Sequence, residues 1–159
     1  MPNEQKSHLH YRVPYADTDK MGVVYYANYL IYFEMGRSQL MHDLGFPYTA
    51  MERLGFALPV IEAHVDYKAP AGYDDELDIC AWVSWIKGVR LQVNCEVFCG
   101  ERLLVSGHTI HACLDLKSRR PVKVIPELAD RYTGLAAPSE ATPGSGTKPP
   151  GTPGQHSVS

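Results

Sequence analysis

The sequence predicts an α+β domain in which one mostly apolar helix lies against an antiparallel sheet of about five strands. Two patterns support this fold class. Apolar residues recur at helical spacing in residues 26–44, and they alternate with polar residues in several later segments. Turn residues separate those later segments, as expected for strands that follow one another in an antiparallel sheet.

The first strand is predicted over residues 8–15, and the helix follows it. The helix is predicted from Tyr26 to Leu44, because its apolar residues follow i, i+3, i+4 spacing. Gly45 and Pro47 stand where a helix would end. The first half of this segment is apolar nearly all round, which predicts a helix buried on most sides, with a sheet wrapped around it.

The strands after the helix are predicted from period-two alternation, which gives each strand one well-buried face. Odd-numbered apolar rows run from Ile61 to Tyr67, from Leu77 to Trp85 and from Leu91 to Cys99. A further long strand is predicted from Leu103 to Leu116, and a short helix over residues 126–132. Together these elements complete the α+β layout.

The composition is that of a globular protein and argues against several functional classes. The chain has 159 residues, of which 45% are hydrophobic and 21% charged, with a formal net charge of -3. This balance suits one domain and lacks the basic surface typical of nucleic-acid binding. No apolar run reaches the roughly 20 residues of a membrane-spanning helix, and the first residues lack a signal peptide's apolar stretch. We therefore expect a cytoplasmic protein with no nucleic-acid partner and no membrane span.

The chain divides into a predicted domain at residues 1–133 and a tail at residues 134–159. The tail is rich in Pro, Gly, Ser and Thr, and its clearly charged side chains are Glu140 and Lys148. Such a segment cannot bury enough apolar surface to offset the entropy lost on ordering. We predict a disordered tail with no catalytic role.

The cysteines give no sign of a metal site. Cys80, Cys95, Cys99 and Cys113 lie in strand-like segments, and none belongs to a Cys-x-x-Cys pair. In a cytosolic protein such cysteines are small apolar residues packed in a sheet. A zinc site would need ligands that cluster more tightly, so we expect no metal.

The segment between the first strand and the helix carries the residues best suited to chemistry. Asp17 and Asp19 stand two residues apart, and Gly22 follows shortly before the helix. One interpretation is a solvated turn, since Asp and Thr side chains bond to nearby backbone. Another is a calcium loop, but its fifth ligand position would be Met21 and its twelfth Asn28 instead of a glutamate. We reject the calcium interpretation.

The third interpretation is a catalytic carboxylate beside a helix N-terminus. Free backbone N–H groups there can hold the negative charge that develops on a carbonyl oxygen under attack. A nearby carboxylate could attack that carbonyl or activate a water molecule that does so. No serine nucleophile is then required, and the chain has no Gly-x-Ser-x-Gly motif.

This segment resembles the signature of the 4-hydroxybenzoyl-CoA thioesterase-like family, the hot-dog acyl-CoA thioesterases. The resemblance covers roughly residues 11–128 and leaves out the tail. The matching residues are Asp17-Thr-Asp19, Gly22-Val-Val-Tyr25, Ala27-Asn28-Tyr29, Phe33-Glu34 with Arg37, Val65-Asp-Tyr-Lys-Ala-Pro-Ala71 and Tyr73-Asp-Asp-Glu-Leu77. An aspartate pair alone would be a weak signal, but the ordered string followed by the strand pattern is specific.

The resemblance implies a hot-dog fold, in which an antiparallel sheet wraps a long helix, and hydrolysis of an acyl-CoA thioester. It also implies a homodimer, often paired into a homotetramer, with active sites at subunit interfaces. No metal or other cofactor is implied. The alternative is a hot-dog module that binds acyl-CoA or an acyl carrier protein without hydrolysis, and the intact Asp19 and Gly22 argue against it.

The family's functional residues carry over onto this loop. The resemblance implies that Asp19 is catalytic and that the backbone N–H of Tyr26 polarises the thioester carbonyl, while Asp17 shapes the loop. Other motif residues expected to contact the substrate are Gly22, Val24 and Tyr25. Some members carry His at the position of Tyr26, and a backbone donor survives that change, whereas a histidine side-chain role does not.

Several residues outside the loop are secondary candidates. His64 lies on the polar face of its strand, which could face solvent, a partner subunit or the substrate tunnel, and a structural role is favoured. Lys87 and Arg90 flank a turn at Gly88, where basic side chains would suit the phosphates of coenzyme A, although surface charge is the simpler explanation. Glu34 and Arg37 are spaced i, i+3 and are interpreted as a structural pair.

Overall fold

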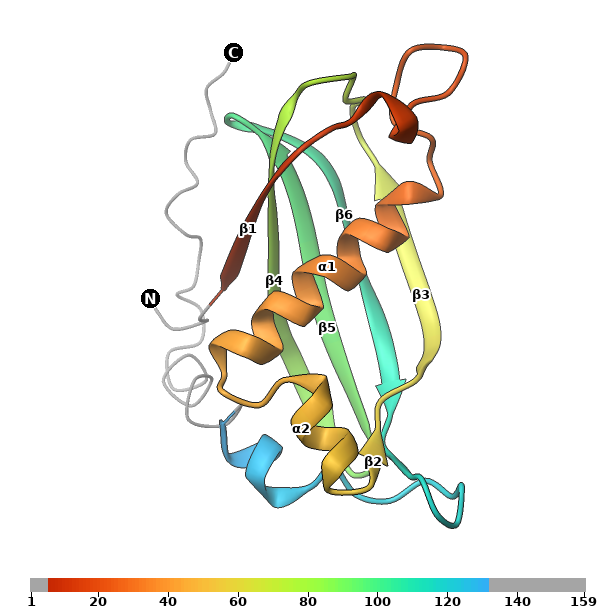
Figure 1. Ribbon diagram of the computed structural model, residues 1–159, viewed down its shortest axis with the longest axis vertical. Helices are drawn as coiled ribbons and strands as arrows, with labels where there is room; N and C mark the ends of the chain where they lie inside the picture. The colour runs from red at the N-terminus through yellow and green to blue at the C-terminus, as the bar shows by residue number, and fades with distance from the viewer. Residues whose placement is uncertain (1–5, 132–159) are drawn as a thin grey trace.

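The computed structural model describes residues 6–131 and shows one helix crossing one face of an antiparallel sheet (Figure 1). The sheet has five strands in the order β1-β4-β5-β6-β3. These strands are β1 Ser7–Arg12, β3 Val60–Tyr67, β4 Glu76–Lys87, β5 Arg90–Cys99 and β6 Arg102–Ala112. The helix is α1, Asn28–Asp43. The predicted α+β hot-dog fold is confirmed, while the predicted tail at residues 134–159 lies outside the described residues.

Smaller elements cover one end of the sheet. They are the short helix α2 Tyr48–Arg53, the strand pair β2 Phe56–Ala57 and β7 Leu114–Asp115, and a helical turn at residues 126–131. The predicted strand from Leu103 to Leu116 is therefore two strands. It breaks at Cys113, whose N–H donates to Val89 O at 2.8 Å instead of continuing the ladder.

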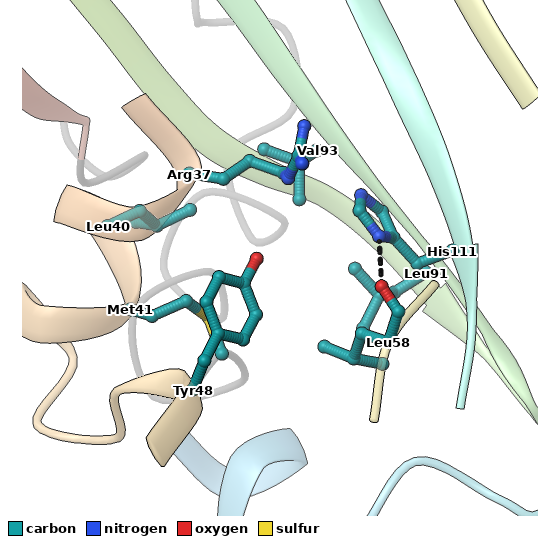
Figure 2. A pocket seen from close by; sticks show the side chains of 8 residues that line it. All are labelled: Arg37, Leu40, Met41, Tyr48, Leu58, Leu91, Val93 and His111. Atoms are coloured by element: carbon teal, nitrogen blue, oxygen red, sulfur yellow. Dashed lines mark hydrogen bonds between the residues drawn. The ribbon is translucent and has the colours of Figure 1, made fainter. Parts of the chain in front are cut away.

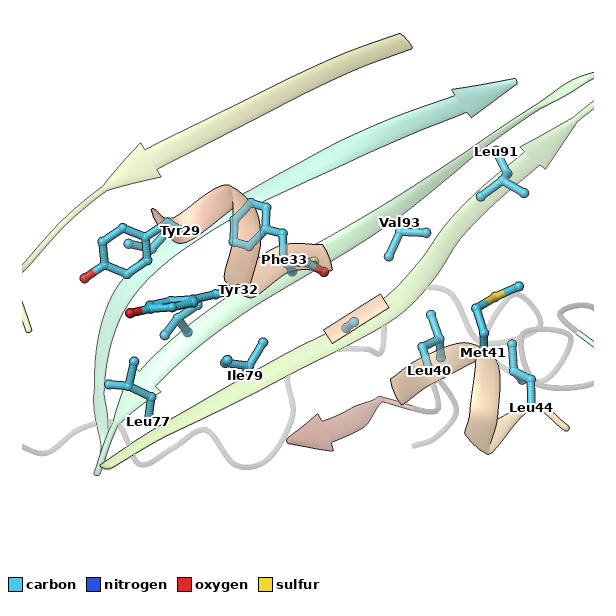
Figure 3. Close-up of a cluster of buried hydrophobic side chains, with 14 of the residues drawn as sticks. Tyr29, Tyr32, Phe33, Leu40, Met41, Leu44, Leu77, Ile79, Leu91 and Val93 are labelled. Atoms are coloured by element: carbon cyan, nitrogen blue, oxygen red, sulfur yellow. The ribbon is translucent and has the colours of Figure 1, made fainter. Parts of the chain in front are cut away.

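The core lies between α1 and the face of the sheet that we call the inner face (Figure 3). Leu77, Ile79 and Ala81 of β4 point to this face and are 0% exposed. Gly36 lets the helix approach closely, because an added Cβ would lie 2.9 Å from Ile79 Cγ2. Alternate side chains of each strand point to the opposite, outer face.

Burial is less complete than the sequence predicted, for α1 and for β3. In α1, Leu30 is 41% and Ile31 53% exposed, because the sheet covers only one side of the helix. In β3, every residue except Val65 is exposed, although one buried face was expected. The reason is position, since β3 is an edge strand and α1 packs mainly against β1 and β4.

One strand register also differs from simple alternation. A bulge between Val83 and Trp85 shifts the end of β4. Trp85 therefore leaves the predicted apolar row, and its indole N–H donates to Gln92 Oε1 at 3.1 Å. A bulge inserts one residue and reverses which face the following side chains meet.

Within the described residues, no helix is long and apolar enough to cross a membrane.

Candidate active site

The loop that carries both aspartates folds as a small hairpin before α1. Thr18 and Val24 form an antiparallel bridge, and Asp19 N–H donates to Val23 O at 2.9 Å. Gly22 N–H closes the turn by donating to Asp19 O at 2.9 Å. Gly22 has a φ of +81°, which favours glycine, although open space surrounds its Cα. Turn geometry thus accounts for the glycine at position 22, while its contact with substrate stays a prediction.

Asp17 is held by the fold on several sides. Its Oδ2 accepts hydrogen bonds from Tyr11 at 2.8 Å and Tyr32 at 2.7 Å. Its carbonyl accepts from the Tyr25 N–H and from Asn28 Nδ2, both at 2.9 Å. Burial first, and then the Asp17 carboxylate, raises the pKa of Tyr11 to about 12. Asp17 therefore connects β1, the loop and the first turns of α1.

Asp19 is half-buried and largely free. Its Oδ1 accepts one hydrogen bond, from the Met21 N–H at 2.9 Å, which fixes the direction of the carboxylate. Within the described residues, no side chain bonds to its Oδ2. The carboxylate is thus oriented by its own turn, and one oxygen is left to act on another molecule.

The start of α1 differs from the prediction in a way that bears on the site. The helix begins at Asn28, not at Tyr26, with Ala27 as its N-cap. Turn-type bonds occupy the N–H groups of Asn28, Tyr29 and Leu30, which donate to Tyr25 O, Tyr26 O and Ala27 O at 2.9, 3.2 and 3.2 Å. Across the described part of the chain, the N–H groups of Tyr26 and Ala27 have no acceptor. The turn before the helix thus leaves two unpaired backbone donors.

Both of these donors belong to peptides whose carbonyls already accept hydrogen bonds. Tyr25 O accepts from Asn28, and Tyr26 O accepts from the Tyr67 hydroxyl at 3.0 Å as well as from Tyr29. Hydrogen bonds in a chain polarise one another, so each N–H becomes a better donor. Sequence reasoning assigned no such role to Tyr67 or Asn28. Their positions in the family string were the only signal, since Tyr67 is 41 residues from Tyr26.

Tyrosine rings cover the outside of this region. Tyr25 and Tyr26 are 46% and 60% exposed, with ring centroids 4.9 Å apart, and Tyr26 meets Tyr67 edge-on at 6.2 Å. The pKa of the Tyr25 hydroxyl is raised, chiefly by its hydrogen bond with Tyr26 and in small part by the charge of Asp19. That last effect places Asp19 within electrostatic range of Tyr25. The loop thus combines an anionic group, free amide donors and exposed aromatic surface.

Two other predicted substrate contacts lie apart from this group. Val24 is 4% exposed and its side chain packs in the core, so it anchors the loop to the domain. His64 is exposed on the outer face of the sheet, where its ring stacks on His108 at a centroid distance of 5.6 Å. Neither side chain joins Asp19 within the chain.

Lys87 and Arg90 lie at the other end of the sheet. The loop meets the start of β4, because Val23 bridges Gly72 and the Val13 N–H donates to Asp75 O at 2.9 Å. Lys87 ends this 12-residue strand, which spans roughly 35–40 Å. These two side chains therefore lie far from the Asp19 loop of the same chain. Sequence alone placed them at the Gly88 turn but could not show that the Asp19 loop meets the opposite end of the sheet.

The pocket between α1, α2 and the sheet is also away from the loop (Figure 2). Its lining residues are Arg37, Leu40, Met41, Tyr48, Leu58, Leu91, Val93 and His111, and they leave no space for a water molecule. Arg37 is 8% exposed and donates to Thr109 Oγ1 at 3.4 Å. The predicted Glu34–Arg37 pair is wrong within the described residues, because Glu34 points to solvent. This pocket is packed core.

Comparisons with known proteins agree on one family. The model of the thioesterase-like superfamily matches residues 13–132. YneP of Bacillus subtilis is 35% identical over 76% of this chain and 88% of its own length. The acyl-CoA thioesterase YbgC of Haemophilus influenzae is 35% identical over 70% of this chain and 82% of its own length. The structure of DHNA-CoA thioesterase from Staphylococcus aureus is similar with a TM-score of 0.80 and 29% identity, over 86% of this chain and 94% of that one. The family match spans the loop, α1 and four of the five strands of the sheet, and it begins just after β1.

Proposed function

The chain belongs to the thioesterase-like superfamily, and from this premise we propose that it hydrolyses an acyl-CoA with Asp19 as the catalytic carboxylate. It is a thioester hydrolase by its family and relatives. The products of the proposed reaction are a free carboxylic acid and coenzyme A. The coenzyme A substrate also fits the cytoplasmic location predicted from the sequence.

The observation that carries the site assignment is the contrast in hydrogen bonding at the loop. Asp19 keeps one carboxylate oxygen free, and the Tyr26 N–H has no acceptor among the described residues. A thioester carbonyl bound to the Tyr26 N–H would gain positive character at carbon and a partner for its developing oxyanion. The Ala27 N–H is a second candidate donor for the same oxygen.

Asp19 can serve hydrolysis by two routes. As a nucleophile, its carboxylate forms a mixed anhydride with the acyl group, the thiolate of coenzyme A leaves, and water then cleaves the anhydride. As a general base, it takes a proton from water while that water attacks the thioester carbon. Both routes use the same oxygen and the same amide donors.

We also propose that two chains pair through β3 to complete the site. Edge strand β3 exposes Val60, Ile61 and Tyr67 at 45%, 51% and 47%, an apolar strip with unpaired backbone groups. Such edges are usually covered, and pairing with an identical strand would form one continuous sheet. Because Tyr67 bonds to Tyr26, this edge lies beside the free amides. A partner chain would therefore supply a wall of the substrate site.

The predicted dimer of dimers would extend this assembly. Lys87 and Arg90 remain candidates for binding coenzyme A phosphates only if another subunit brings them to the loop. A native mass equal to one chain at assay concentration would contradict the paired site. Native mass spectrometry or light scattering after size exclusion provides that measurement.

The test of the proposed function is thiol release from a panel of short aliphatic, long aliphatic and aromatic acyl-CoAs. We expect wild-type protein to hydrolyse at least one class. Asp19→Asn should lower kcat by about 10²- to 10⁴-fold, as expected for loss of an acid–base or nucleophilic group. The native mass and the melting temperature should stay near those of the wild type, because Asp19 bonds only within its own turn.

Glu52→Gln is the matched control, since Glu52 is an exposed carboxylate of α2, away from the loop and from β3. It should keep wild-type turnover. Full activity of Asp19→Asn on every hydrolysed substrate would rule out the assignment of Asp19. Binding of acyl-CoA without thiol release by the wild type would favour the non-catalytic module instead.

A further inference from the structure

A second cluster of chemically active side chains lies on the outer face of the sheet, across the sheet from α1. His8 of β1 pairs in register with Cys80 of β4, and the next pair on that face joins His10 to Asp78. Side chains on this face alternate with inner-face residues such as Leu77 and Ile79. The register therefore brings residues 70 or more positions apart into contact.

Three potential metal ligands meet at this point. His8 Nδ1 lies 3.1 Å from Asp78 Oδ2 and 3.3 Å from Cys80 Sγ. Cys80 Sγ lies 3.6 Å from the same Asp78 oxygen. Each of the three atoms thus contacts both of the others, and a single cation could touch all three.

These separations match a tetrahedral zinc shell. With Zn–N and Zn–O bonds of about 2.1 Å and a Zn–S bond of about 2.3 Å, adjacent ligand atoms are roughly 3.4–3.6 Å apart. The observed spacings of 3.1, 3.3 and 3.6 Å need shifts of only a few tenths of an ångström to fit. We propose that His8, Asp78 and Cys80 form a zinc site, with a water molecule as the fourth ligand.

The ligand types select the metal. One imidazole nitrogen, one sulfur and one carboxylate oxygen suit a borderline-soft ion such as zinc, and cobalt can replace it as a spectroscopic probe. Magnesium and calcium prefer oxygen ligands alone and should not compete. The site is accessible from solvent, because the His8 side chain is 55% exposed, while Cys80 is 2% exposed.

The surrounding charges favour a cation. Glu96 of β5 is the register partner of Cys80, so a second carboxylate lies nearby. The Lys6 ammonium group, whose charge also acts on Cys80, pairs with Glu96 at 3.6 Å and lies 4.2 Å over the Trp82 ring. The positive charge of Lys6 therefore offsets the negative charge of Glu96, and the negative charge of Asp78 remains available to a metal ion.

The expected effect of zinc is structural. Within residues 6–131, edge strand β1 pairs with β4 alone, and a shared metal would fasten the two strands across more than 70 positions of sequence. Tyr11 of the same strand holds Asp17, so stabilising β1 also steadies the loop before α1. Zinc should raise the melting temperature of the whole chain without entering the hydrolytic reaction.

The test uses the full-length chain without a histidine tag, freed of metal by a chelator. Calorimetric titration with zinc should show one ion bound per chain, and the melting temperature should rise. Cobalt should give a thiolate charge-transfer band together with the intense visible bands of tetrahedral coordination. Absence of saturable binding to the wild type, or a cobalt spectrum without the thiolate band, would overturn the proposal.

Variants assign the ligands. His8→Gln should weaken zinc binding by more than about 100-fold, since even loss of an outer partner of a metal ligand costs roughly 10- to 100-fold. Cys80→Ser should abolish the thiolate band, and His8→Gln keeps the test decisive if that buried change impairs folding. His64→Gln and Cys99→Ser are matched controls and should bind zinc like the wild type. Unchanged affinity in His8→Gln would refute the site, whatever the outcome of the thiol-release assay.

Discussion

Asp17 and Asp19 belong to the same loop, but the fold surrounds one with donors and leaves the other open. Asp17 receives two tyrosine hydroxyls on its carboxylate and two donors on its carbonyl. Asp19 receives one hydrogen bond on its carboxylate and one on its carbonyl, and both come from its own turn. The same contrast separates backbone groups at the helix start, where Asn28 N–H is bonded and Tyr26 N–H is not. Groups held by the fold position the groups that remain free for chemistry.

After the loss of the Asp19 carboxylate, the largest effect should come from removing a free backbone donor without touching a side chain. Replacing Tyr26 by its α-hydroxy acid analogue turns the amide into an ester, which deletes the N–H and also weakens the Tyr25 carbonyl that accepts from Asn28. We expect kcat to fall by about 10²- to 10³-fold, as for loss of one oxyanion donor. Stopped-flow or steady-state thiol release provides the measurement. Tyr26→Phe is the control and should keep turnover within about threefold, because only the backbone is assigned a role. Equal falls in kcat in both variants would assign the role to the Tyr26 side chain instead of its backbone N–H.

A second prediction concerns His111, a buried side chain of the core, and its effect on folding stability at low pH. The pKa of His111 is lowered to about 4 by burial first, with a further lowering by the charge of Arg37. The unfolded imidazole takes up its proton near pH 6.5, so acidification from pH 6.5 toward 4 favours the unfolded chain. This should cost up to about 3 kcal/mol of folding stability across that window.

Urea unfolding at several pH values measures this slope. In His111→Asn the slope should flatten, even if the variant is less stable at every pH. The relevant quantity is the difference in unfolding free energy between pH 7 and pH 4. Identical differences in wild type and variant would show that His111 is not the group responsible.

A smaller effect should follow from weakening the held aspartate. Asp17→Asn keeps the size of the side chain but removes the charge that strengthens its bonds to Tyr11 and Tyr32. We expect the unfolding free energy to fall by about 2 kcal/mol, within the range for hydrogen bonds to charged groups. Asp19→Asn should change it by less than about 0.5 kcal/mol. If the two variants were equally stable, the distinction between held and free carboxylates would fail.

Much of the fold could be predicted from local patterns. The helix, the strands of the five-stranded sheet and the loop with its glycine turn all follow from spacing of apolar residues and turn chemistry. The errors lie where neighbours decide the outcome. Tyr26 follows the helical spacing, yet the helix begins two residues later, at Asn28. A turn precedes it, and this turn leaves the Tyr26 N–H unpaired within the described residues. Trp85 follows the alternation, yet a bulge moves it to the other face.

The sequence by itself determined the turn that holds Asp19, because the Met21 and Gly22 N–H groups bond to Asp19 within a few residues. Only the tertiary structure decided which distant residues meet. It placed Lys87 and Arg90 at the far end of the sheet, brought Tyr67 to the Tyr26 carbonyl, and joined His8 to Asp78 and Cys80. The physical reason is that strand register depends on packing across the whole sheet. A one-residue slip would turn each of these side chains to the opposite face.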